Sequence, residues 1–425
     1  MNNLPKNWTI ATLNDVAKLT SGGTPLATKK EYYENGTIPW LVIGDLTDSF
    51  VEHSEKYITE IALKESNAKL LPIGTLLIAM YGSIGKLGIT KIECATNQAI
   101  ASIIEFYGID KFFLFYLFLY KRPFLMQLGK GGTQKNISLA VLNSLEIPLP
   151  PLAEQGRIVA KIEELFAGID AGVENLKSVK NQIALYRQSV LKSILSGFAT
   201  DTLANHVDMC LGKMLDKEKN KGTLFPYLRN KNVRWKNFDL DDLLEMRFEE
   251  SEEERYSIQR GDLVVCEGGE PGRCAVWEND NVIKFQKALH RLRPHDNMNV
   301  YFLMYVFMLN IQAKNWDRFF TGSTIKHLTG EALKNLQIPV PTLAEQEKIV
   351  AEIESRFKRA DALETAVDRA LNDAEKLKQA VLKKAFSGEL VPQNPDDEPA
   401  SVLLARIRAA RAAEQRANPK KGKRK

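Results

Sequence analysis

The sequence predicts an α+β fold with an internal duplication, in which two mixed α/β domains are each followed by a long helix. Three observations lead to this fold class. The stretch Ile147–Gly197 recurs without a gap as Ile338–Gly388, and 22 of the 51 aligned positions are identical. Within both stretches apolar residues recur at steps of three and four, which places one apolar stripe along a helix. Upstream of each stretch, short apolar runs bounded by turn residues alternate with one aromatic run, as in mixed α/β structure.

The duplication extends upstream of these stretches, although the matches there are weaker. The offset between matching segments drifts from 187 to 191 residues, as small loop insertions would produce. Each copy is therefore a divergent part of about 145 residues and a well-kept part of about 50, a period too long for a solenoid. The matching upstream segments are 38–46 with 225–233, 80–86 with 267–273, 112–118 with 301–307, and 131–138 with 322–329.

Each well-kept stretch predicts a helix of about 44 residues, roughly 65 Å long at ~1.5 Å per residue. The residues Thr342–Glu345 form a capping box, with Pro151 in place of threonine in the first copy. Gly197 and Gly388 stand where the helices would end. One stripe is rich in Ile, Leu and Val and the other in Ala, so the two helices can lie close together as a coiled coil. Pairing with another protein, or with a second copy of the chain, is the alternative.

These features divide the chain into five segments. Within the divergent parts, the aromatic runs Phe112–Leu119 and Tyr301–Leu309 are expected to form buried helices. The segments are 1–150, the first α/β domain; 151–198, the first long helix; 199–341, the second α/β domain; 342–391, the second long helix; and 392–425, a C-terminal helix and basic tail.

Composition limits the class of protein. The chain has 425 residues, of which 44% are hydrophobic and 26% charged, as in soluble globular proteins of two or more domains. The first residues show no charged-then-apolar signal region, and the run Phe112–Tyr120 is too short to cross a bilayer. The four Cys and five His show neither metal-ligand nor disulfide spacing. We expect a cytoplasmic protein without a membrane segment or a bound metal.

The net charge of +5 is a weak indication of a nucleic-acid partner, because most of the basic excess lies near the end of the chain. From Pro399 onward, nine Lys or Arg stand against one acid, Glu414. The ending NPKKGKRK is by default a solvated tail that touches phosphate only non-specifically.

Both copies carry the motif I-P-x-P-x-L-A-E-Q followed by a long helix and Ser-Gly, and Lys383–Ala413 then forms a closing segment. In this order of parts, over essentially the full chain, the sequence resembles the specificity subunit of type I restriction–modification enzymes. The resemblance implies that each divergent part is a target recognition domain, which reads one half of a split, asymmetric DNA site. It also implies that the long helices form an antiparallel coiled coil with pseudo-twofold symmetry, hold the two domains apart and dock methyltransferase subunits.

The resemblance further implies the partners and the absence of catalysis. The partners are double-stranded DNA, two methyltransferase (M) subunits and, through the complex, the restriction/translocase (R) subunits. The chain itself would be non-catalytic and would hold no cofactor, while S-adenosylmethionine, ATP and Mg²⁺ would bind the partner subunits.

Two pairs of matching loops are candidates for DNA contact. The pair at 131–136 and 322–327 combines glycine, which permits close backbone approach, with hydroxyl, amide and cationic groups that suit phosphate oxygens. The pair at 81–86 and 268–273 is glycine-rich and ends in a cation but lacks the spacing of a P-loop. Each pair also fits a plain turn, and both interpretations stay open. The candidate residues are Gly131, Gly132, Thr133, Lys135, Gly322, Ser323, Thr324 and Lys326 in the first pair, and Lys86 and Arg273 in the second.

A third candidate occurs in the second copy alone. Basic and amide side chains that can pair with guanine and adenine edges in the major groove follow a strand-like run. The matching residues 42–45 of the first copy are Val-Ile-Gly-Asp, so the cationic role does not transfer. This difference fits two domains that read different sequences, and it also fits two structural segments. The candidate residues are Arg229, Asn230, Lys231 and Asn232.

Two other function classes are weighed against this one. A nuclease or DNA methyltransferase would be indicated by N-P-P-[YF], a glycine-rich cofactor fingerprint or a Walker A motif, and the sequence contains none of them. The acidic run Glu249–Glu254 resembles a metal site, although a solvated loop is the more common form of such a run. A coiled-coil adaptor would explain the helices but not the two divergent domains. Incubating the purified chain with Mg²⁺ and unmodified DNA tests the enzyme class.

Overall fold

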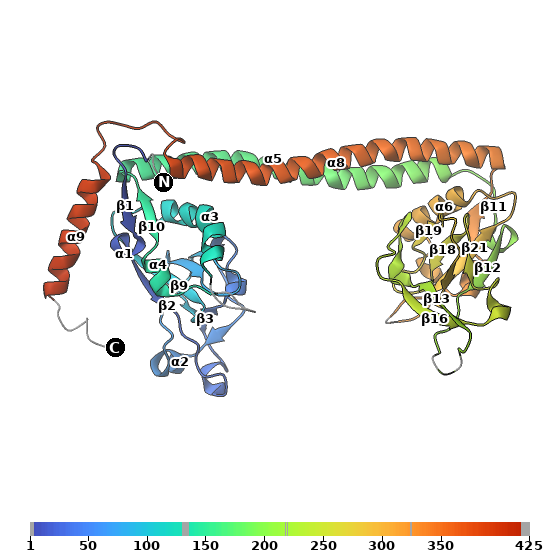
Figure 1. Ribbon diagram of the computed structural model, residues 1–425, viewed down its shortest axis with the longest axis horizontal. Helices are drawn as coiled ribbons and strands as arrows, with labels where there is room; N and C mark the ends of the chain where they lie inside the picture. Colours follow the sequence, from blue (N-terminus) through green and yellow to red (C-terminus); the bar gives the residue numbers. More distant parts are fainter. Residues whose placement is uncertain (1–3, 130–135, 217, 219, 324, 418–425) are drawn as a thin grey trace. The chain divides into compact units, whose positions relative to one another are not determined.

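The computed structural model describes residues 4–129, 136–216, 218, 220–323 and 325–417. The chain divides into two compact units (Figure 1). The first unit combines the N-terminal part up to Glu174 with the C-terminal part from Leu371 onward, and the second unit spans Asn175–Ala370. Each unit therefore contains one α/β domain together with a section of both long helices.

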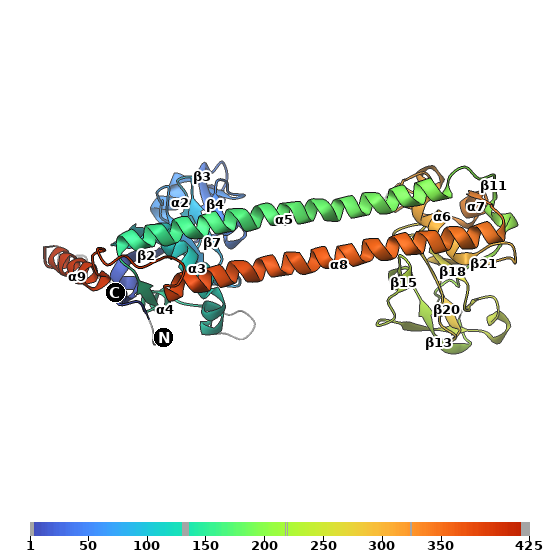
Figure 2. The same ribbon diagram turned by 90° about the horizontal axis from the view of Figure 1, so that it is seen from above.

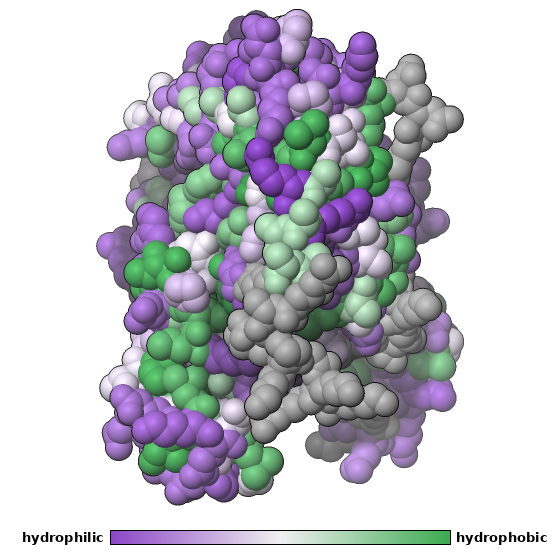
Figure 3. Space-filling model, turned by 90° about the vertical axis from the view of Figure 1, so that its left-hand side faces the viewer, coloured by the Kyte–Doolittle hydropathy of each residue, from purple (hydrophilic) through white to green (hydrophobic). Residues whose placement is uncertain are grey.

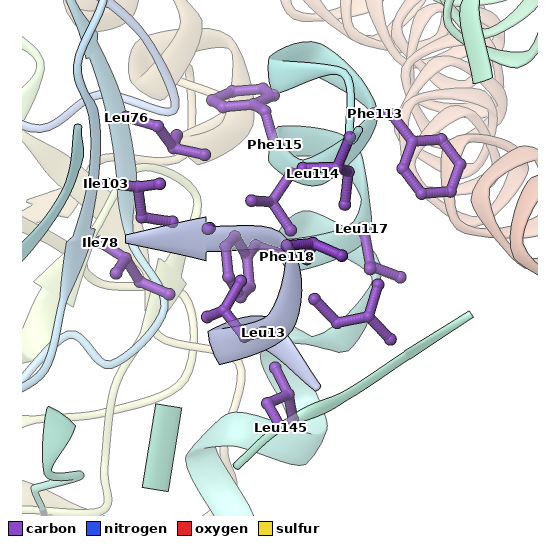
Figure 4. Packing of buried hydrophobic residues seen from close by; sticks show 14 of the residues in the cluster. Leu13, Leu76, Ile78, Ile103, Phe113, Leu114, Phe115, Leu117, Phe118 and Leu145 are labelled. Atoms are coloured by element: carbon purple, nitrogen blue, oxygen red, sulfur yellow. The ribbon is translucent and has the colours of Figure 1, made fainter. Parts of the chain in front are cut away.

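The domain of the first unit is built on a mixed sheet with the strand order β2-β9-β6-β7-β4. Helix α3, Lys111–Leu128, packs its apolar side chains against this sheet. Figure 4 shows Leu114 and Phe118 of α3 in the same buried cluster as Ile103 of the sheet. The aromatic run of the first copy thus forms the buried helix that the sequence predicts. The strands are β2 Ala17–Ser21, β4 Ser49–Val51, β6 Leu76–Ala79, β7 Leu87–Thr90 and β9 Ile100–Phe106.

Smaller elements complete the first domain. A second sheet has the order β5-β3-β8, and β1 pairs with β10 in an antiparallel ladder that brings the N-terminal strand beside the start of α5. Short 3₁₀ turns lie at Lys30–Tyr32 and Ile43–Asp45. The other elements are β1 Thr9–Thr12, α1 Leu13–Val16, β3 Ile38–Leu41, β5 Tyr57–Ile58, α2 Glu60–Glu65, β8 Ala95–Thr96, α4 Leu139–Asn143 and β10 Glu146–Leu149.

The domain of the second unit repeats this topology, as the duplicated sequence predicts. The sheet β12-β21-β18-β19 matches β2-β9-β6-β7, and the parallel pairing of β13 with β20 matches that of β3 with β8. Helix α6, Val300–Gln312, takes the place of α3. The other elements are β11 Thr200–Thr202, β12 Val207–Leu211, β13 Thr223–Leu228, β14 Val233–Arg234, β15 Asn237–Phe238, β16 Leu244–Phe248, β17 Ser257–Ile258, β18 Leu263–Cys266, β19 Cys274–Val276, β20 Ile283–Phe285, β21 Leu289–Pro294, α7 Gly330–Lys334 and β22 Gln337–Pro339.

The two well-kept stretches form the long helices α5, Leu152–Leu195, and α8, Leu343–Ser387 (Figure 2). Each helix ends shortly before a glycine with a positive φ, Gly197 at 89° and Gly388 at 81°. Because side chains disfavour this left-handed conformation, glycine is the residue that commonly terminates a helix there.

Within each unit the sections of α5 and α8 run antiparallel and are joined by ion pairs. In the first unit Asp170 of α5 pairs with Lys378 of α8, and in the second unit Arg187 of α5 pairs with Asp361 of α8. Within the second unit Lys180 also pairs with Asp368, so the ion pairs move forward along α5 as they move back along α8. The ion pairs of the two units occupy equivalent positions of the repeat with the helices exchanged.

The predicted apolar stripes are only partly covered by this pairing. Ile183 of α5 and Val367 of α8 are buried, at 5% and 4% exposure. Tyr186, Leu363 and Leu377 also belong to the stripes, yet their exposed fractions are 44%, 50% and 53%. The helix pair therefore keeps apolar side chains at its surface.

The glutamine of the L-A-E-Q motif joins each long helix to its domain. Gln155 is fully buried; its Oε1 accepts a hydrogen bond from the Asp110 backbone at 2.7 Å, and its Nε2 donates to Gly108 O at 3.2 Å and Pro150 O at 3.0 Å. Asp110 is the N-cap residue of α3. The side chain of Gln155 thus connects the first turn of α5 to the start of the aromatic helix.

The second unit contains the same arrangement. Gln346 accepts from the Asn299 backbone at 2.7 Å and donates to Asn297 O at 3.0 Å and Pro341 O at 2.9 Å. Asn299 is the N-cap residue of α6. In both copies, therefore, the glutamine of the motif is explained by the three hydrogen bonds that its buried amide makes, one accepted and two donated.

The segment after α8 packs against the N-terminal part of the first unit. Glu154 is buried, and its Oε1 accepts from Trp8 Nε1 at 3.0 Å and from Gln393 Nε2 at 2.6 Å. Burial raises the pKa of Glu154, while these two hydrogen bonds partly offset that effect. Helix α9, Ala400–Ala417, lies beside α1, where Arg408 forms a bidentate pair with Asp15 (Figure 1).

The described residues contain neither a membrane-spanning helix nor a metal site. No described helix has the length and apolar character to span a membrane, and no described group of His, Cys, Asp or Glu could hold a metal ion. Burial raises the pKa of the Cys94 thiol to about 12 and that of Cys266 to about 11, so both thiols are protonated at neutral pH. On the face shown in Figure 3, hydrophobic residues form separate patches among hydrophilic ones.

Candidate nucleic-acid interface

Three loops converge in the second unit, and all three contain residues that the sequence suggests for DNA contact. The loop between β18 and β19 meets the loop after α6, because Leu328 N donates to Glu267 O at 2.7 Å and His327 forms a β-bridge with Gly268. The segment after β13 meets the same place, since Asn230 Nδ2 donates to Gly268 O at 3.4 Å. Residues far apart in the sequence thus form one surface.

The first unit brings the corresponding loops together in the same way. Ile137 N donates to Met80 O at 2.9 Å, and Tyr81 forms a β-bridge with Asn136. Lys86 Nζ lies 3.4 Å from Ile43 O, in the segment after β3. The shared backbone contacts show that the loop arrangement belongs to the scaffold of both domains.

The glycine-rich loops at 81–86 and 268–273 join consecutive antiparallel strands. Gly85 and Gly272 have φ values of 79° and 87°, and their N–H groups donate to Ala79 O at 2.9 Å and Cys266 O at 2.8 Å. Their backbone is therefore that of the plain strand-to-strand turn that the sequence left as one interpretation. Whether the turns also touch DNA stays a prediction.

Lys86 and Arg273 close these turns, and both hold the neighbouring loop. Arg273 is 9% exposed; its Nη2 donates to Asn230 O at 2.9 Å and its Nη1 lies 2.7 Å from Glu270 Oε2. Lys86 makes the corresponding contacts with the carbonyl oxygens of Ile43 and Gly44. In this structure each of these cations holds the neighbouring loop in place. The spacing of the residues in the sequence did not predict this role.

The residues Asn230–Asn232 form a 3₁₀ turn preceded by Arg229, and the contacts of this segment are mostly internal. Asn232 is 1% exposed; its Oδ1 accepts from Arg229 N at 2.9 Å and its Nδ2 donates to Asp239 O at 2.9 Å. Arg229 Nη2 donates to Asp242 O at 2.6 Å, and Lys231 pairs with the Asp242 carboxylate. Of these residues, Lys231 has the most accessible charge, with a side chain 51% exposed.

The loop after α6 carries the most accessible candidates of the second unit. Thr321 and His327 exchange backbone hydrogen bonds of 2.9 Å and 2.8 Å, which holds these two residues side by side. Gly322 has a φ of 93°, and Ser323 is exposed. Lys326 is 57% exposed and lies 3.5 Å from Asp317. The candidates Gly131, Gly132, Thr133, Lys135 and Thr324 lie outside the described residues.

Two residues that the site prediction omitted lie at the centre of the converging loops. His327 Nδ1 is 3.3 Å from Glu267 Oε2, and the two side chains are 41% and 17% exposed. The first unit has Asn136 and Met80 at the matching positions, while the backbone contacts are the same. In the sequence they could have been found as positions where the loops of the two copies match but the side chains differ.

The acidic run is mostly the solvated loop that its sequence suggests, since Glu250, Ser251, Glu253 and Glu254 are exposed. Glu249 and Glu252 both pair with Lys213, whose side chain is only 6% exposed. Two carboxylates of the run thus compensate one buried ammonium group, which would otherwise be costly to desolvate. Their role in the structure is to hold the start of the second domain together.

A comparison with known protein families assigns the chain to one of them. The model for the "type I restriction modification DNA specificity domain" matches residues 5–181 and again 208–372. The chain belongs to this family. The two matches fall on the two copies of the repeat, so the specificity domain occurs twice. The predicted relation to type I specificity subunits, rather than to the catalytic proteins of these systems, is confirmed.

Relatives and solved structures of the same family resemble the chain over most of its length. It is 26% identical to the EcoKI specificity subunit of Escherichia coli over 96% of this chain and 97% of that one. It is likewise 26% identical to the StySPI specificity subunit of Salmonella potsdam, covering 96% of each. A chain from a structure of complex assembly in a type I restriction–modification system covers 92% of this protein with a TM-score of 0.73 and 20% identity. The HsdS subunit of Thermoanaerobacter tengcongensis gives a TM-score of 0.55 at 19% identity.

Proposed function

We propose that this member of the specificity family is the DNA-recognition subunit of a type I restriction–modification enzyme. Each α/β domain reads one half of a bipartite, asymmetric DNA site, and the helix pair docks two methyltransferase subunits. The observation that carries the proposal is the double occurrence of the specificity domain, with one set of converging loops in each unit. Two half-sites need two readers, and one duplicated chain supplies both.

The loop chemistry supports DNA as the ligand. Ser323 and Lys326 are exposed on a loop whose glycine permits close backbone approach, the combination suited to phosphate oxygens. Glu267 and His327 beside that loop offer an acceptor and a ring nitrogen to base edges. The shared backbone contacts of the loops fix where these side chains lie, and the side chains themselves differ between the two units. Such a pattern suits two domains that bind different half-sites.

The surface of the helix pair supports protein docking. In the second unit Ile183, Tyr186 and Leu363 line an apolar hollow of about 340 Å³ on the helices. Exposed apolar side chains rimmed by charge mark protein interaction sites. The same ion pair between the long helices recurs in each unit, so the docking elements occur twice, which fits two copies of one partner. R subunits join through this complex.

The catalytic chemistry belongs to the partners in this proposal. The chain holds no cofactor of its own, and S-adenosylmethionine, ATP and Mg²⁺ bind the M and R subunits. The complex acts on cytoplasmic DNA. The chain contributes position and specificity, which together decide where the partners act.

The test is to express the chain with its cognate methyltransferase subunit in a host that lacks both, and to sequence the modified bases. We expect modification in a split, asymmetric motif with a fixed unread spacer, and none when either subunit is omitted. Cleavage or methyl transfer by the chain alone would refute the proposal. A continuous palindromic motif would refute the assignment of one half-site to each domain.

A further inference from the structure

An exposed tyrosine lies at the centre of the converging loops of the first unit. Tyr81 is 39% exposed, and it forms a β-bridge with Asn136 of the loop after α3. Tyr81 is also the first residue of the glycine-rich turn whose last residue, Lys86, contacts the segment after β3. The tyrosine therefore stands where the three loops of this unit meet.

The second unit has a ring in the same place, although the ring comes from a different loop. Gly268 matches Tyr81, and a β-carbon at Gly268 would lie 3.0 Å from Nδ1 and 3.1 Å from Cε1 of His327. The imidazole ring of His327 thus occupies the space that a side chain at position 268 would enter. Because the β-bridge between the two loops is the same in both units, each unit presents one ring at this point.

The backbone beside Tyr81 is open in the first unit and covered in the second. A β-carbon at Gly82 would meet no described atom within 4 Å apart from its neighbours in the chain. A β-carbon at the matching Gly269 would instead lie 2.8 Å from Asn230 Nδ2. Bare backbone permits the close approach of a ligand. The first unit therefore leaves room for a ligand directly beside the tyrosine ring.

The side chains that border this open backbone are apolar in the first unit. The segment 42–45 takes the place of 229–232, because each segment is contacted by the cation that closes the neighbouring turn. Val42 and Ile43 of this segment are partly exposed, and their counterparts are an arginine and an asparagine. The middle of the loop surface is thus apolar in the first unit and polar in the second.

We propose that Tyr81 contacts a base of the first half-site in the major groove, and that it recognises the C5 methyl group of a thymine. This methyl group is the apolar feature of the major groove, and it distinguishes thymine from cytosine. The ring of Tyr81 and the side chain of Ile43 offer an apolar surface to it, while Gly82 lets the DNA approach. The inference deepens the proposed function and rests on it, because it names a specificity-determining residue of the first domain.

The experiment replaces each thymine of the first half-site in turn, on either strand, by deoxyuridine, which lacks only the C5 methyl group. The half-site is first identified from the bases that the chain and its methyltransferase subunit modify together. Fluorescence anisotropy then measures the binding of this complex to each duplex. We expect one of the replacements to weaken binding by about fourfold, which is the effect of losing the burial of one methyl group.

Three variants assign this effect to the tyrosine ring. Tyr81→Ala should bind the thymine and deoxyuridine duplexes equally, whereas Tyr81→Phe, which keeps the ring, should retain the difference between them. Tyr57→Ala is the matched control and should also retain it. Tyr57 is another exposed tyrosine of the first domain, but it lies on β5 and pairs with Pro39 near the start of β3. The thermal midpoint of each variant shows whether its fold is intact.

The outcomes separate this inference from the proposed function. Equal binding of the thymine and deoxyuridine duplexes at every position would overturn the thymine contact and leave the proposed function intact. Loss of the difference in Tyr81→Phe would also overturn it, since the hydroxyl group would then be the reader. The proposed function itself fails if the unchanged chain and its methyltransferase subunit modify no split motif. A difference at one thymine that disappears only in Tyr81→Ala would support both.

Discussion

Replacing Gln155 by leucine should destabilise the first unit of this protein by about 3–5 kcal/mol. Leucine has nearly the volume of glutamine, so the change removes hydrogen bonds without leaving a large cavity. The loss comprises the bond accepted from Asp110 N and those donated to Gly108 O and Pro150 O. Each net hydrogen bond contributes about 1 kcal/mol, and a buried group left without a partner costs about 1–3 kcal/mol.

Differential scanning calorimetry of the full chain measures this effect. In a unit of this size, 1 kcal/mol shifts the midpoint by about 2–4 °C, so the transition of the first unit should fall by roughly 6–20 °C. Gln346→Leu should do the same to the second unit, and the exposed Gln379→Leu on α8 is the control. A shift no larger than that of Gln379→Leu would show that the buried amide is not what joins the long helix to its domain.

Three further predictions address the C-terminal helix and the DNA-binding surfaces. Hydrogen bonding to Arg408 holds the pKa of Asp15 well below its ordinary value, so the contact adds its full stability above about pH 4 and loses it as the pH falls through the lowered pKa; Arg408→Gln should therefore lower the unfolding midpoint more at pH 7 than near pH 2. Lys326→Ala should weaken binding to all DNA sequences alike and reduce the salt-dependence slope by about one, unlike Lys376→Ala on α8. Replacing residues 1–145 by those of a related subunit should change one half of the methylated motif, and a change in both halves would contradict two independent readers.

The duplication and the long helices could be predicted because they depend on local patterns. Ile147–Gly197 and Ile338–Gly388 repeat the same residues at helical spacing, and the terminal glycines mark the ends. The packing of the last segment could not be predicted in this way. Arg408 and Asp15 are 393 residues apart, and no periodicity links them. Only the folded chain shows that the end of the protein completes its first unit.

The candidate site was predictable as a set of loops but not in the roles of its side chains. The matching glycine-rich loops indicated where the two domains share a surface, and the structure brings them together. Arg273 and Asn232 look like free polar groups in the sequence, yet both bind backbone of their own domain. A side chain's partner depends on which distant loop lies beside it. Spacing along one loop contains no information about that neighbour.

The repeat also gives an internal means of separating scaffold from recognition. Positions where the two units share backbone contacts but differ in side chain are free to vary without disturbing the fold. Glu267 and His327 stand at two such positions, and Met80 and Asn136 occupy them in the first unit. The contact between Leu328 N and Glu267 O uses only backbone atoms, as does the bridge of His327 with Gly268. Exchanging the side chains should therefore leave the loops in place.

The double variant Glu267→Met with His327→Asn, which gives the second unit the residues of the first, should change the free energy of unfolding by no more than about 1 kcal/mol. The removed contact is partly exposed, and such substitutions have small effects on stability. The acceptor and the ring nitrogen that could face base edges are both lost, and each good base contact contributes about 1–3 kcal/mol of discrimination. Sequencing of the methylated bases should show a relaxed or altered second half-site, with the first half-site and the spacer unchanged. An unaltered motif at full methylation would remove Glu267 and His327 from sequence reading, and a change in the first half-site would contradict the independence of the two domains.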